Sequence, residues 1–458
     1  MVFASFVFLF WFLPVFLAGY YATPSRWRNL VLTIGSFVFY GWWRPHYVLL
    51  MLVSVVIDYT AAVQMGAGAG GRRRKLWLLA SIVSNLGLLA WFKYANLFVG
   101  TWNELTPWPV EWERVLLPIG ISFFTFQSMS YTIDVYRGNV QPVRSLLDLL
   151  CFVSMFPQLV AGPVVRYSDV QDQIRGRSVD PRMLSDGVFL FAIGFVKKVL
   201  IADSVAPLVN AVWAQGAPGL ASAWLGSVAY SVQIYFDFSG YSDMAIGLGM
   251  LLGFRFPSNF LSPYRAHSVT EIWRRWHVSL STWLRDYLYV PLGGNRKGEL
   301  RAQTNVMITM LLGGLWHGAA WNYLLWGGIH GTFLVLERRH KGALYGALPR
   351  PLQVLLTFVI WTVAIMIFHC ETGADLAKMV GGIVGLGGVG TVPQLGDRAP
   401  FAYGALLVGL FVAFAVPRSE LLVARFHPLV MLGSFAVFLL AVCQLLSSDF
   451  VPFIYFQF

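Results

Sequence analysis

Long apolar stretches separated by short charged connections run through most of the 458 residues of this chain. A helix needs about 20 residues to cross the ~30 Å hydrocarbon core of a membrane, and we count roughly eleven runs of suitable length. The earlier runs predict helices over residues 2–20, 29–43, 46–65, 76–98 and 115–135. The pattern therefore predicts an all-α, polytopic membrane helical bundle.

Later apolar runs predict helices near residues 303–316, 319–336, 352–370, 401–416 and 429–446. The segment LLCFVSMFPQLVAGPVVR is also apolar but is broken by Pro157, Gly162 and Pro163. It suits a re-entrant or broken helix, which a membrane tolerates only where protein or water satisfies the free backbone groups. No domain boundary is visible. We expect residues 1–458 to form a single membrane-embedded domain whose motifs lie in about 115–336.

Composition supports the membrane assignment. The chain is 57% hydrophobic and 12% charged, which leaves too little polar surface to cover a soluble globule of this size. Lys and Arg outnumber Asp and Glu 33 to 22. Most of the excess falls in short loops, as expected beside anionic lipid on the cytoplasmic side rather than for binding nucleic acid. Alternate basic loops, near Arg26, Arg72 and Arg137, predict an N-terminus on the outer face. The three cysteines lie far apart and indicate neither a disulfide nor a metal site.

Four charges interrupt the central apolar runs. Lys197 and Lys198 stand in the middle of the run over 187–213, and the next two runs are joined by YFDFSGYSDM, which carries Asp237 and Asp243. These charges favour a polar cavity inside the bundle, with the two carboxylates as candidate substrate contacts. The alternative places the charges at the membrane interfaces, with the lysines snorkelling.

The stretch SVTEIWRRWHVSLSTWLRDYLYVPLGGNRKG is amphipathic. A helix over residues 273–288, at about 100° per residue, places tryptophan and leucine on one face and Arg274, Arg275 and Arg285 on the other. Such a helix typically lies in the membrane interface, and its arginines suit a phosphorylated ligand. His277 falls on the apolar face. Binding of lipid headgroups does not explain a histidine there, so His277 is a candidate functional residue.

A second histidine, His317, stands inside the apolar run GGLWHGAAWN. An ionisable residue at membrane depth is costly and marks a functional site by default. The adjacent glycines, Gly313, Gly314 and Gly318, allow a backbone or substrate to approach closely. His330 shares this site only if the helix breaks between the two histidines.

The chemistry of such a site is limited by what surrounds the imidazole. No Ser or Cys is paired with His317 as a nucleophile, and no carboxylates are spaced to bind metal with it. A neutral imidazole suits general-base work on a hydroxyl. The simplest chemistry is direct transfer, in which His317 takes a proton from an acceptor hydroxyl that attacks an activated acyl group. Trp316 and Asn322 are candidates to orient His317 or to stabilise the oxyanion.

At these residues the sequence resembles the membrane-bound O-acyltransferases, and within them the bacterial branch that acts on polysaccharides. The resemblance rests on YFDFSGYSDMAIGLG, TEIWRRWHVSLSTWLRDYLYVPLGGNRKG and LLGGLWHGAAWNYLLWGGIHG, in this order, with LPIGISFFTFQSMSYTIDVYRG and FPQLVAGP before them. It covers most of residues 1 to about 340.

The resemblance implies a helical bundle around a central tunnel, with the signature histidine matching His317 and the second characteristic histidine matching His277. It implies cytoplasmic acetyl-CoA as the donor, with no bound cofactor, and an exported polysaccharide, such as alginate, as the acceptor. The acetyl group then crosses the inner membrane, either directly to the polymer or through a periplasmic acetyltransferase partner. Arg274, Arg275, Arg285, Arg296 and Lys297 become candidates for the coenzyme A phosphates.

Several alternatives remain at this stage. Within the family, the alternative acceptors are cellulose, another exopolysaccharide, peptidoglycan and teichoic acid, the last with D-alanine as the acyl group. A transporter or lipid-linked sugar flippase needs a polar tunnel too, but it predicts paired repeats with matching broken helices, and the sequence shows no internal symmetry.

Overall fold

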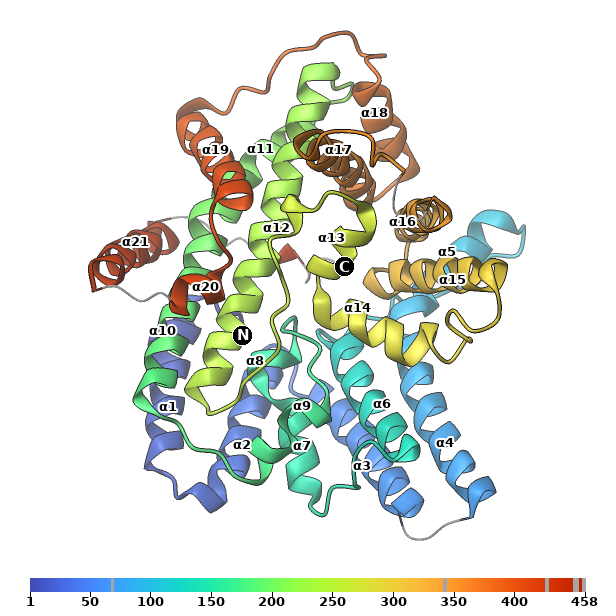
Figure 1. Cartoon of the computed structure of the whole chain (residues 1–458), viewed down its shortest axis with the longest axis vertical. Helices are drawn as coiled ribbons and strands as arrows, with labels where there is room; N and C mark the ends of the chain where they lie inside the picture. The colour runs from blue at the N-terminus through green and yellow to red at the C-terminus, as the bar shows by residue number, and fades with distance from the viewer. Residues whose placement is uncertain (67–69, 341–343, 425–427, 448–452, 455–458) are drawn as a thin grey trace. The chain divides into compact units, whose positions relative to one another are not determined.

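The computed structural model describes residues 1–66, 70–340, 344–424, 428–447 and 453–454, and every regular element in these ranges is helical (Figure 1). The chain divides into two compact units. Unit 1 contains Met1–Phe191 and Met244–Pro257, and unit 2 contains Ala192–Asp243 and Ser258–Phe458. The expected all-helical class is confirmed.

Unit 1 is built mainly from the first ten helices. These are α1 (Leu13–Ala22), α2 (Arg28–Gly41), α3 (Tyr47–Gly66), α4 (Gly71–Leu89), α5 (Ala95–Leu105), α6 (Ile121–Arg137), α7 (Leu146–Ser154), α8 (Phe156–Leu159), α9 (Tyr167–Arg175) and most of α10 (Pro181–Val196). The predicted break near Pro157 is confirmed, because α7 ends at Ser154 and the four-residue α8 follows.

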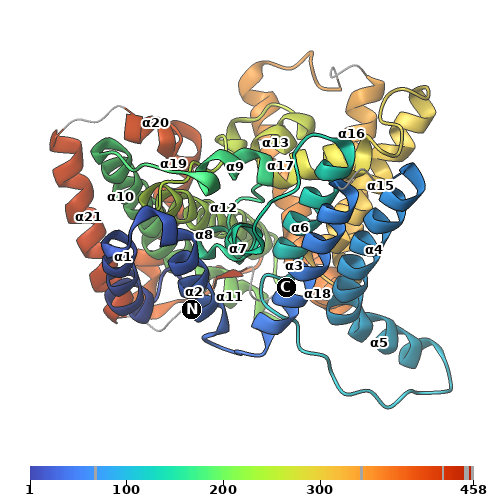
Figure 2. The ribbon, with the colours of Figure 1, turned by 90° about the horizontal axis from the view of Figure 1, so that it is seen from below.

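Helices α3, α4 and α6 of unit 1 pack side by side (Figure 2). A buried polar cluster joins them. The carboxylate of Asp58 on α3 accepts hydrogen bonds from Ser81 Oγ (2.5 Å) and Asn85 Nδ2 (2.9 Å) on α4, and from Ser128 on α6. These three donors satisfy the hydrogen-bonding capacity of the buried carboxylate. The cluster therefore fixes the register of the three helices.

Unit 2 contains the remaining helices and the two histidines of interest. A π-helical turn (Lys197–Ala202) precedes α11 (Asp203–Trp213), and α12 (Leu220–Leu251) runs on into unit 1. The others are α13 (Val269–Arg275), α14 (Val278–Leu284), a π-helical turn (Arg285–Tyr289), α15 (Glu299–His317), α16 (Trp321–Arg339), α17 (Arg350–His369), α18 (Gly373–Ile383), α19 (Ala399–Ala415), α20 (Ser419–Ala424) and α21 (Pro428–Ser447).

The expected connection at YFDFSGYSDM is wrong, because α12 continues through it as one helix of 32 residues. Its two carboxylates are neutralised by lysines from the preceding helical run. Lys198 Nζ lies 2.5 Å from Asp237 Oδ1, and Lys197 Nζ lies 2.6 Å from Asp243 Oδ2. With the charges paired inside unit 2, the helix has no need to leave the apolar environment. The snorkelling alternative is also wrong for Lys198, whose side chain is only 3% exposed.

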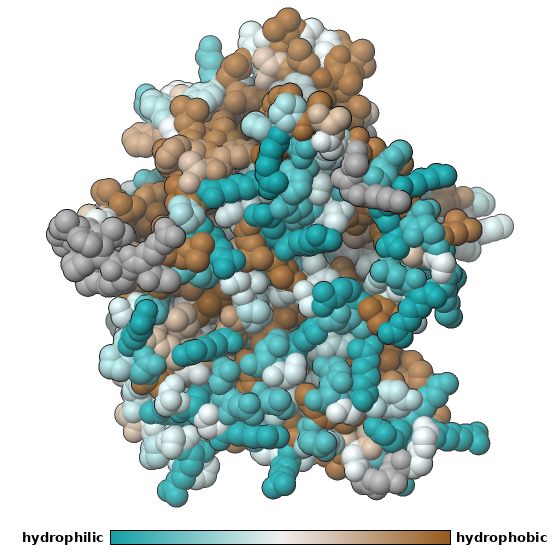
Figure 3. Space-filling view, viewed as in Figure 1, coloured by the Kyte–Doolittle hydropathy of each residue, from teal (hydrophilic) through white to brown (hydrophobic). Residues whose placement is uncertain are grey.

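Four helical segments of the described chain are long and apolar enough to cross a membrane: Tyr47–Gly66, Gly71–Leu105, Arg350–His369 and Gly396–Ala415. The expected count of about eleven spans is not confirmed, because α12, α15 and α16 are long enough but carry more polar residues, and other apolar runs form shorter helices. Hydrophobic side chains gather near the top of the face in Figure 3, over α18 and α19. Phe401 there is 75% exposed, as expected for a surface that meets lipid.

Glycines bring α15 and α16 into backbone contact. A Cβ on Gly314 of α15 would lie 2.2 Å from the carbonyl oxygen of Tyr323, and a Cβ on Gly327 of α16 would lie 2.3 Å from that of Met310. No side chain fits at either position. This contact holds the end of α15, and therefore His317, against α16.

We expect Gly327→Ala to loosen the α15–α16 hairpin, because the added Cβ meets backbone rather than a flexible side chain. Overpacking of this kind costs about 1–3 kcal/mol. The effect is measured as a lower melting temperature of the purified protein in detergent.

Gly328→Ala is the matched control. Its Cβ would lie 3.6 Å from Leu311 Cδ2, an ordinary contact, and replacing a helical glycine by alanine gains up to about 1 kcal/mol. This variant should be as stable as the parent protein or more stable. Equal melting temperatures for the two variants would contradict the close-packing argument.

Candidate active site

His317 is the last residue of α15, and its side chain is buried at 6% exposure. Aromatic rings enclose it on three sides, edge-on, with ring centroids 5.0 Å away for Trp316, 5.3 Å for Trp326 and 5.4 Å for Phe368. The chain turns directly after it at Gly318, where the ring of Tyr323 occupies the space that a Cβ would fill. The turn thus presents the imidazole at the end of a helix, inside an aromatic cage.

His277 lies at a break between α13 and α14, with a left-handed backbone (φ 46°). The expected continuous helix over 273–288 is therefore wrong. The segment after α12 supplies the competing acceptors, since the backbone N–H of Val278 donates to the Asn259 carbonyl (3.0 Å). A non-glycine residue at positive φ costs about 1–3 kcal/mol, and such residues cluster at functional sites. The expected burial of His277 is confirmed at 1% exposure.

One indole links the two histidines. The Trp316 ring centroid lies 6.1 Å from that of His277 and 5.0 Å from that of His317. The ring of Phe238 on α12 also packs against His277, perpendicular to it and with 4.7 Å between the ring centroids. The structure therefore brings together two histidines that are 40 residues apart in the sequence.

Two further residues of the predicted set adjoin this centre. Asn322 lies in the first turn of α16, and its Nδ2 donates to the backbone carbonyl of Phe368 at 3.1 Å, beside His317 rather than to it. His330 lies beyond Trp326, at 4.8 Å between ring centroids. The helix does break between His317 and His330, at Gly318–Ala320, so the condition for a shared site is met, with the Trp326 ring between the two imidazoles.

Several charged residues that were predicted to contact the substrate form ion pairs with other side chains. Asp237 and Asp243 form the lysine pairs described above, and Asp237 also accepts from the Ile454 N–H (2.8 Å). Arg275 Nη2 contacts Glu271 Oε1 at 2.6 Å. Arg274 is exposed on α13.

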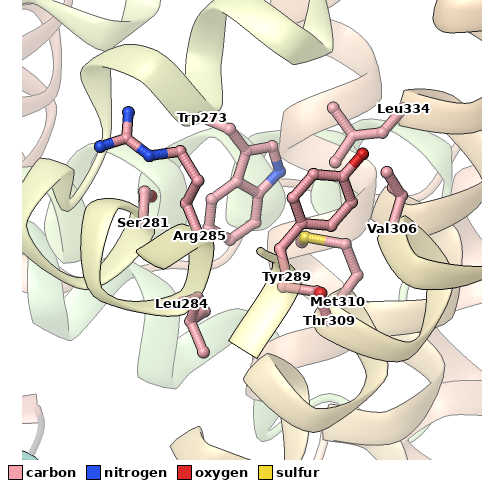
Figure 4. A pocket seen from close by; sticks show the side chains of 9 residues that line it. All are labelled: Trp273, Ser281, Leu284, Arg285, Tyr289, Val306, Thr309, Met310 and Leu334. Atoms are coloured by element: carbon pink, nitrogen blue, oxygen red, sulfur yellow. The ribbon is translucent and has the colours of Figure 1, made fainter. Parts of the chain in front are cut away.

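A pocket of about 180 Å³ lies between α14, α15 and α16, and the ring of Trp273 in its wall packs against Trp326, with 5.5 Å between the ring centroids. Its walls are mostly apolar, and the guanidinium of Arg285 stands at its margin, on the side of Ser281 (Figure 4). Arg285 Nε pairs with Asp286 Oδ1 at 2.7 Å. Leu284 of the pocket wall packs against α15 at Gly313, where an added Cβ would lie 3.2 Å from Leu284 Cδ1. The lining residues are Trp273, Ser281, Leu284, Arg285, Tyr289, Val306, Thr309, Met310 and Leu334.

Burial at the centre favours the neutral form of the His277 imidazole. Burial lowers the pKa of His277 to about 3, because an imidazolium loses its hydration there. Within the described ranges, no group of three or more His, Cys, Asp or Glu side chains is arranged to hold a metal ion. His277 is thus neutral in its apolar enclosure, with one ring nitrogen free of hydrogen and able to accept a hydrogen bond.

Sequence reasoning missed three members of this centre. Trp326 and Phe368 complete the cage of His317, and Asn259 contacts His277, with Nδ1 and Oδ1 3.1 Å apart. Asn259 precedes His277 by 18 residues, and no spacing rule connects them. The available signal was an amide side chain among the apolar residues of FPSNFL.

The family model described as MBOAT, membrane-bound O-acyltransferase family, matches residues 122–371. This stretch contains both histidines and Asn259. It also covers more than half of the chain.

Curated relatives extend the match. A probable alginate O-acetylase of Azotobacter vinelandii is 48% identical over 81% of this chain and 75% of its own length. One of Pseudomonas aeruginosa is 49% identical over 81% of this chain and 72% of its own. A peptidoglycan O-acetyltransferase of Helicobacter pylori is 36% identical over 84% and 80%.

Site geometry, apolar helices and sequence similarity lead to one assignment. The two buried histidines suit acyl transfer to a hydroxyl, and the apolar helices suit a membrane. The relatives, named as acetylases, share most of the chain. The protein is therefore a membrane O-acyltransferase and belongs to the membrane-bound O-acyltransferase family.

Proposed function

We propose that this protein moves acetyl groups from cytoplasmic acetyl-CoA across the inner membrane for O-acetylation of an exported polysaccharide, alginate or a related exopolysaccharide. The polymer receives the acetyl group directly or through a periplasmic acetyltransferase partner. Relatives named as alginate O-acetylases are 48% and 49% identical, against 36% for the one named as a peptidoglycan O-acetyltransferase. This difference favours alginate-like acceptors.

The observation that carries the proposal is the buried pair His277 and His317 on either side of Trp316. In the proposed reaction His317 accepts the proton of an acceptor hydroxyl while that oxygen attacks the thioester carbonyl. The carbon–sulfur bond then breaks, and the coenzyme A thiolate leaves and takes the proton from the His317 imidazolium. The aromatic cage excludes water, which would otherwise compete as the acceptor.

The neighbours of His317 take supporting roles in this proposal. Asn322 Nδ2 is held by the Phe368 carbonyl, so Asn322 acts by fixing the ring that borders His317. Trp316 separates the two imidazoles and shapes the space between them. Asp237 and Asp243 hold α12 in place through their lysines, and α12 in turn presents Phe238 to His277.

We place the donor in the pocket between α14, α15 and α16. Its apolar walls suit the pantetheine arm, and Arg285 at its margin suits a phosphate, with which arginine pairs bidentately. The exposed cations Arg274, Arg296 and Lys297 are further candidates for phosphate contacts, whereas Arg275 is held by Glu271.

His317→Ala should reduce acetylation of the exported polymer to background, because loss of a general base alone costs roughly 10²- to 10⁴-fold. The measurement is the acetyl content of the polymer made by a deletion strain that carries the variant, with the amount of folded protein in the membrane checked in parallel. His340→Ala, at the exposed end of α16, is the control and should acetylate normally. Normal acetylation by His317→Ala would refute the proposal.

Arg285→Gln tests the donor site. It should raise the KM for acetyl-CoA by roughly 10-fold, the value of one charge-assisted hydrogen bond. The KM for acetyl-pantetheine, which lacks the phosphates, should change little. Both are measured as acetyl transfer by purified protein.

Arg398→Gln, at another exposed arginine of unit 2, serves as the matched control and should leave both KM values unchanged. An equal rise for the two donors in Arg285→Gln would exclude a phosphate contact at this residue.

A further inference from the structure

The Asn259 side chain stands at the junction that holds His277. It is 1% exposed, and its Oδ1 faces three groups at once. Ser279 Oγ donates to it at 2.9 Å, the Ser279 backbone N–H donates at 3.3 Å, and His277 Nδ1 lies 3.1 Å away.

These contacts fix the tautomer of His277. A backbone N–H can only donate, so the amide atom that faces Ser279 must be the oxygen of Asn259 rather than its nitrogen. An amide oxygen only accepts, so Nδ1 of His277 must carry a hydrogen. In the neutral ring the lone pair then lies on Nε2.

The Nε2 atom of His277 is buried and has no hydrogen-bond partner in the described part of the chain. The groups that face the ring are Phe238 from α12, Trp316 from α15 and Asn259 from the segment between α12 and α13. The neighbouring titratable groups on these elements are Asp237, which is paired with Lys198, and His317. A buried acceptor without a donor is unfavourable, and a ligand that donates to it removes this penalty.

We propose that Asn259 is a positioning residue, which holds His277 as the Nδ1–H tautomer so that Nε2 accepts a hydrogen bond from an N–H or O–H group of the substrate during acyl transfer. The inference rests on the proposed function, since it requires transfer at the His317 centre. The left-handed backbone of His277 fits this role, because the Asn259 contacts hold a conformation that is otherwise unfavourable.

Asn259→Asp in the full-length protein is the decisive variant. A carboxylate keeps an acceptor oxygen toward Ser279 and His277 Nδ1, so the geometry and the tautomer are retained. Its negative charge raises the pKa of His277. Below the raised pKa the imidazolium donates at Nε2 instead of accepting, and above it the neutral ring accepts again.

We therefore expect the rate of transfer by Asn259→Asp to fall by roughly 10-fold as the pH decreases, which is the value of one hydrogen bond to a charged or buried group. The rate should recover toward the parental rate as the pH rises. The assay is acetyl transfer in membrane vesicles buffered on both sides, over mildly acidic to mildly alkaline pH. Asn103→Asp, at an exposed position on α5, makes the same chemical change elsewhere and should keep the parental pH profile.

A double-mutant cycle supplies a second, pH-independent test. If Asn259 acts through His277, then Asn259→Ala combined with His277→Ala should be no slower than His277→Ala alone. Additive losses, or an Asn259→Asp protein that is folded but has the parental pH profile, would overturn the proposal. A purely structural role predicts loss at every pH.

The kinetics also identify the donating group. If the substrate N–H belongs to the pantetheine arm, Asn259→Ala raises the Kd for acetyl-CoA measured without acceptor as well as the KM in transfer. If the O–H belongs to the acceptor, only transfer is affected. Failure of the proposed function is seen separately, as normal acetylation by His317→Ala with Asn259 intact.

Discussion

The site depends on the backbone contact between α15 and α16. Two carbonyl oxygens, of Tyr323 and Met310, lie where a Cβ at Gly314 or Gly327 would have to stand, so the two helices approach as closely as their main chains allow. His317 ends α15 at this contact, and Trp326 projects from α16 onto its ring. In an apolar bundle, van der Waals packing of this kind replaces the hydrophobic effect as the force that joins helices.

The second half of the site follows from a different constraint, the break at His277. A continuous helix would carry residues 273–288 past the histidine centre. The Asn259 backbone and side chain instead take over hydrogen bonds at Val278 and Ser279, so α14 begins anew and His277 turns toward Trp316. The cost of the left-handed residue is offset by contacts that come from a segment 18 residues earlier in the sequence.

The helical class and the buried position of His317 could be predicted from the sequence, because both leave local signals: apolar runs of membrane length, and one ionisable residue among glycines. The catalytic role of His317 stays a prediction. The sequence also predicted that His277 is buried. It did not predict the break at His277 or the unbroken α12, since both depend on partners distant in sequence. In the sequence, Asp237 and Asp243 indicate a polar connection between two helices. In the structure they pair with Lys198 and Lys197, and the periodicity of the sequence does not reveal such a pairing. The role of each site residue likewise depends on a ligand, which neither helix patterns nor residue spacing specify.

The buried polar groups of unit 2 fall into two kinds, and the difference indicates where a ligand acts. The lysine and aspartate side chains complete one another at 2.5 and 2.6 Å, so they need nothing further and stabilise the helices that carry them. The ring nitrogens of His330 and the Nε2 of His277 have no hydrogen-bond partner among the described residues. Both histidines adjoin the aromatic rings that flank His317. Buried polar groups are rarely left without a partner. A neutral imidazole has one acceptor and one donor nitrogen, so under the proposed function the substrate donates a hydrogen bond to Nε2 of His277, and His330 requires both a donor and an acceptor.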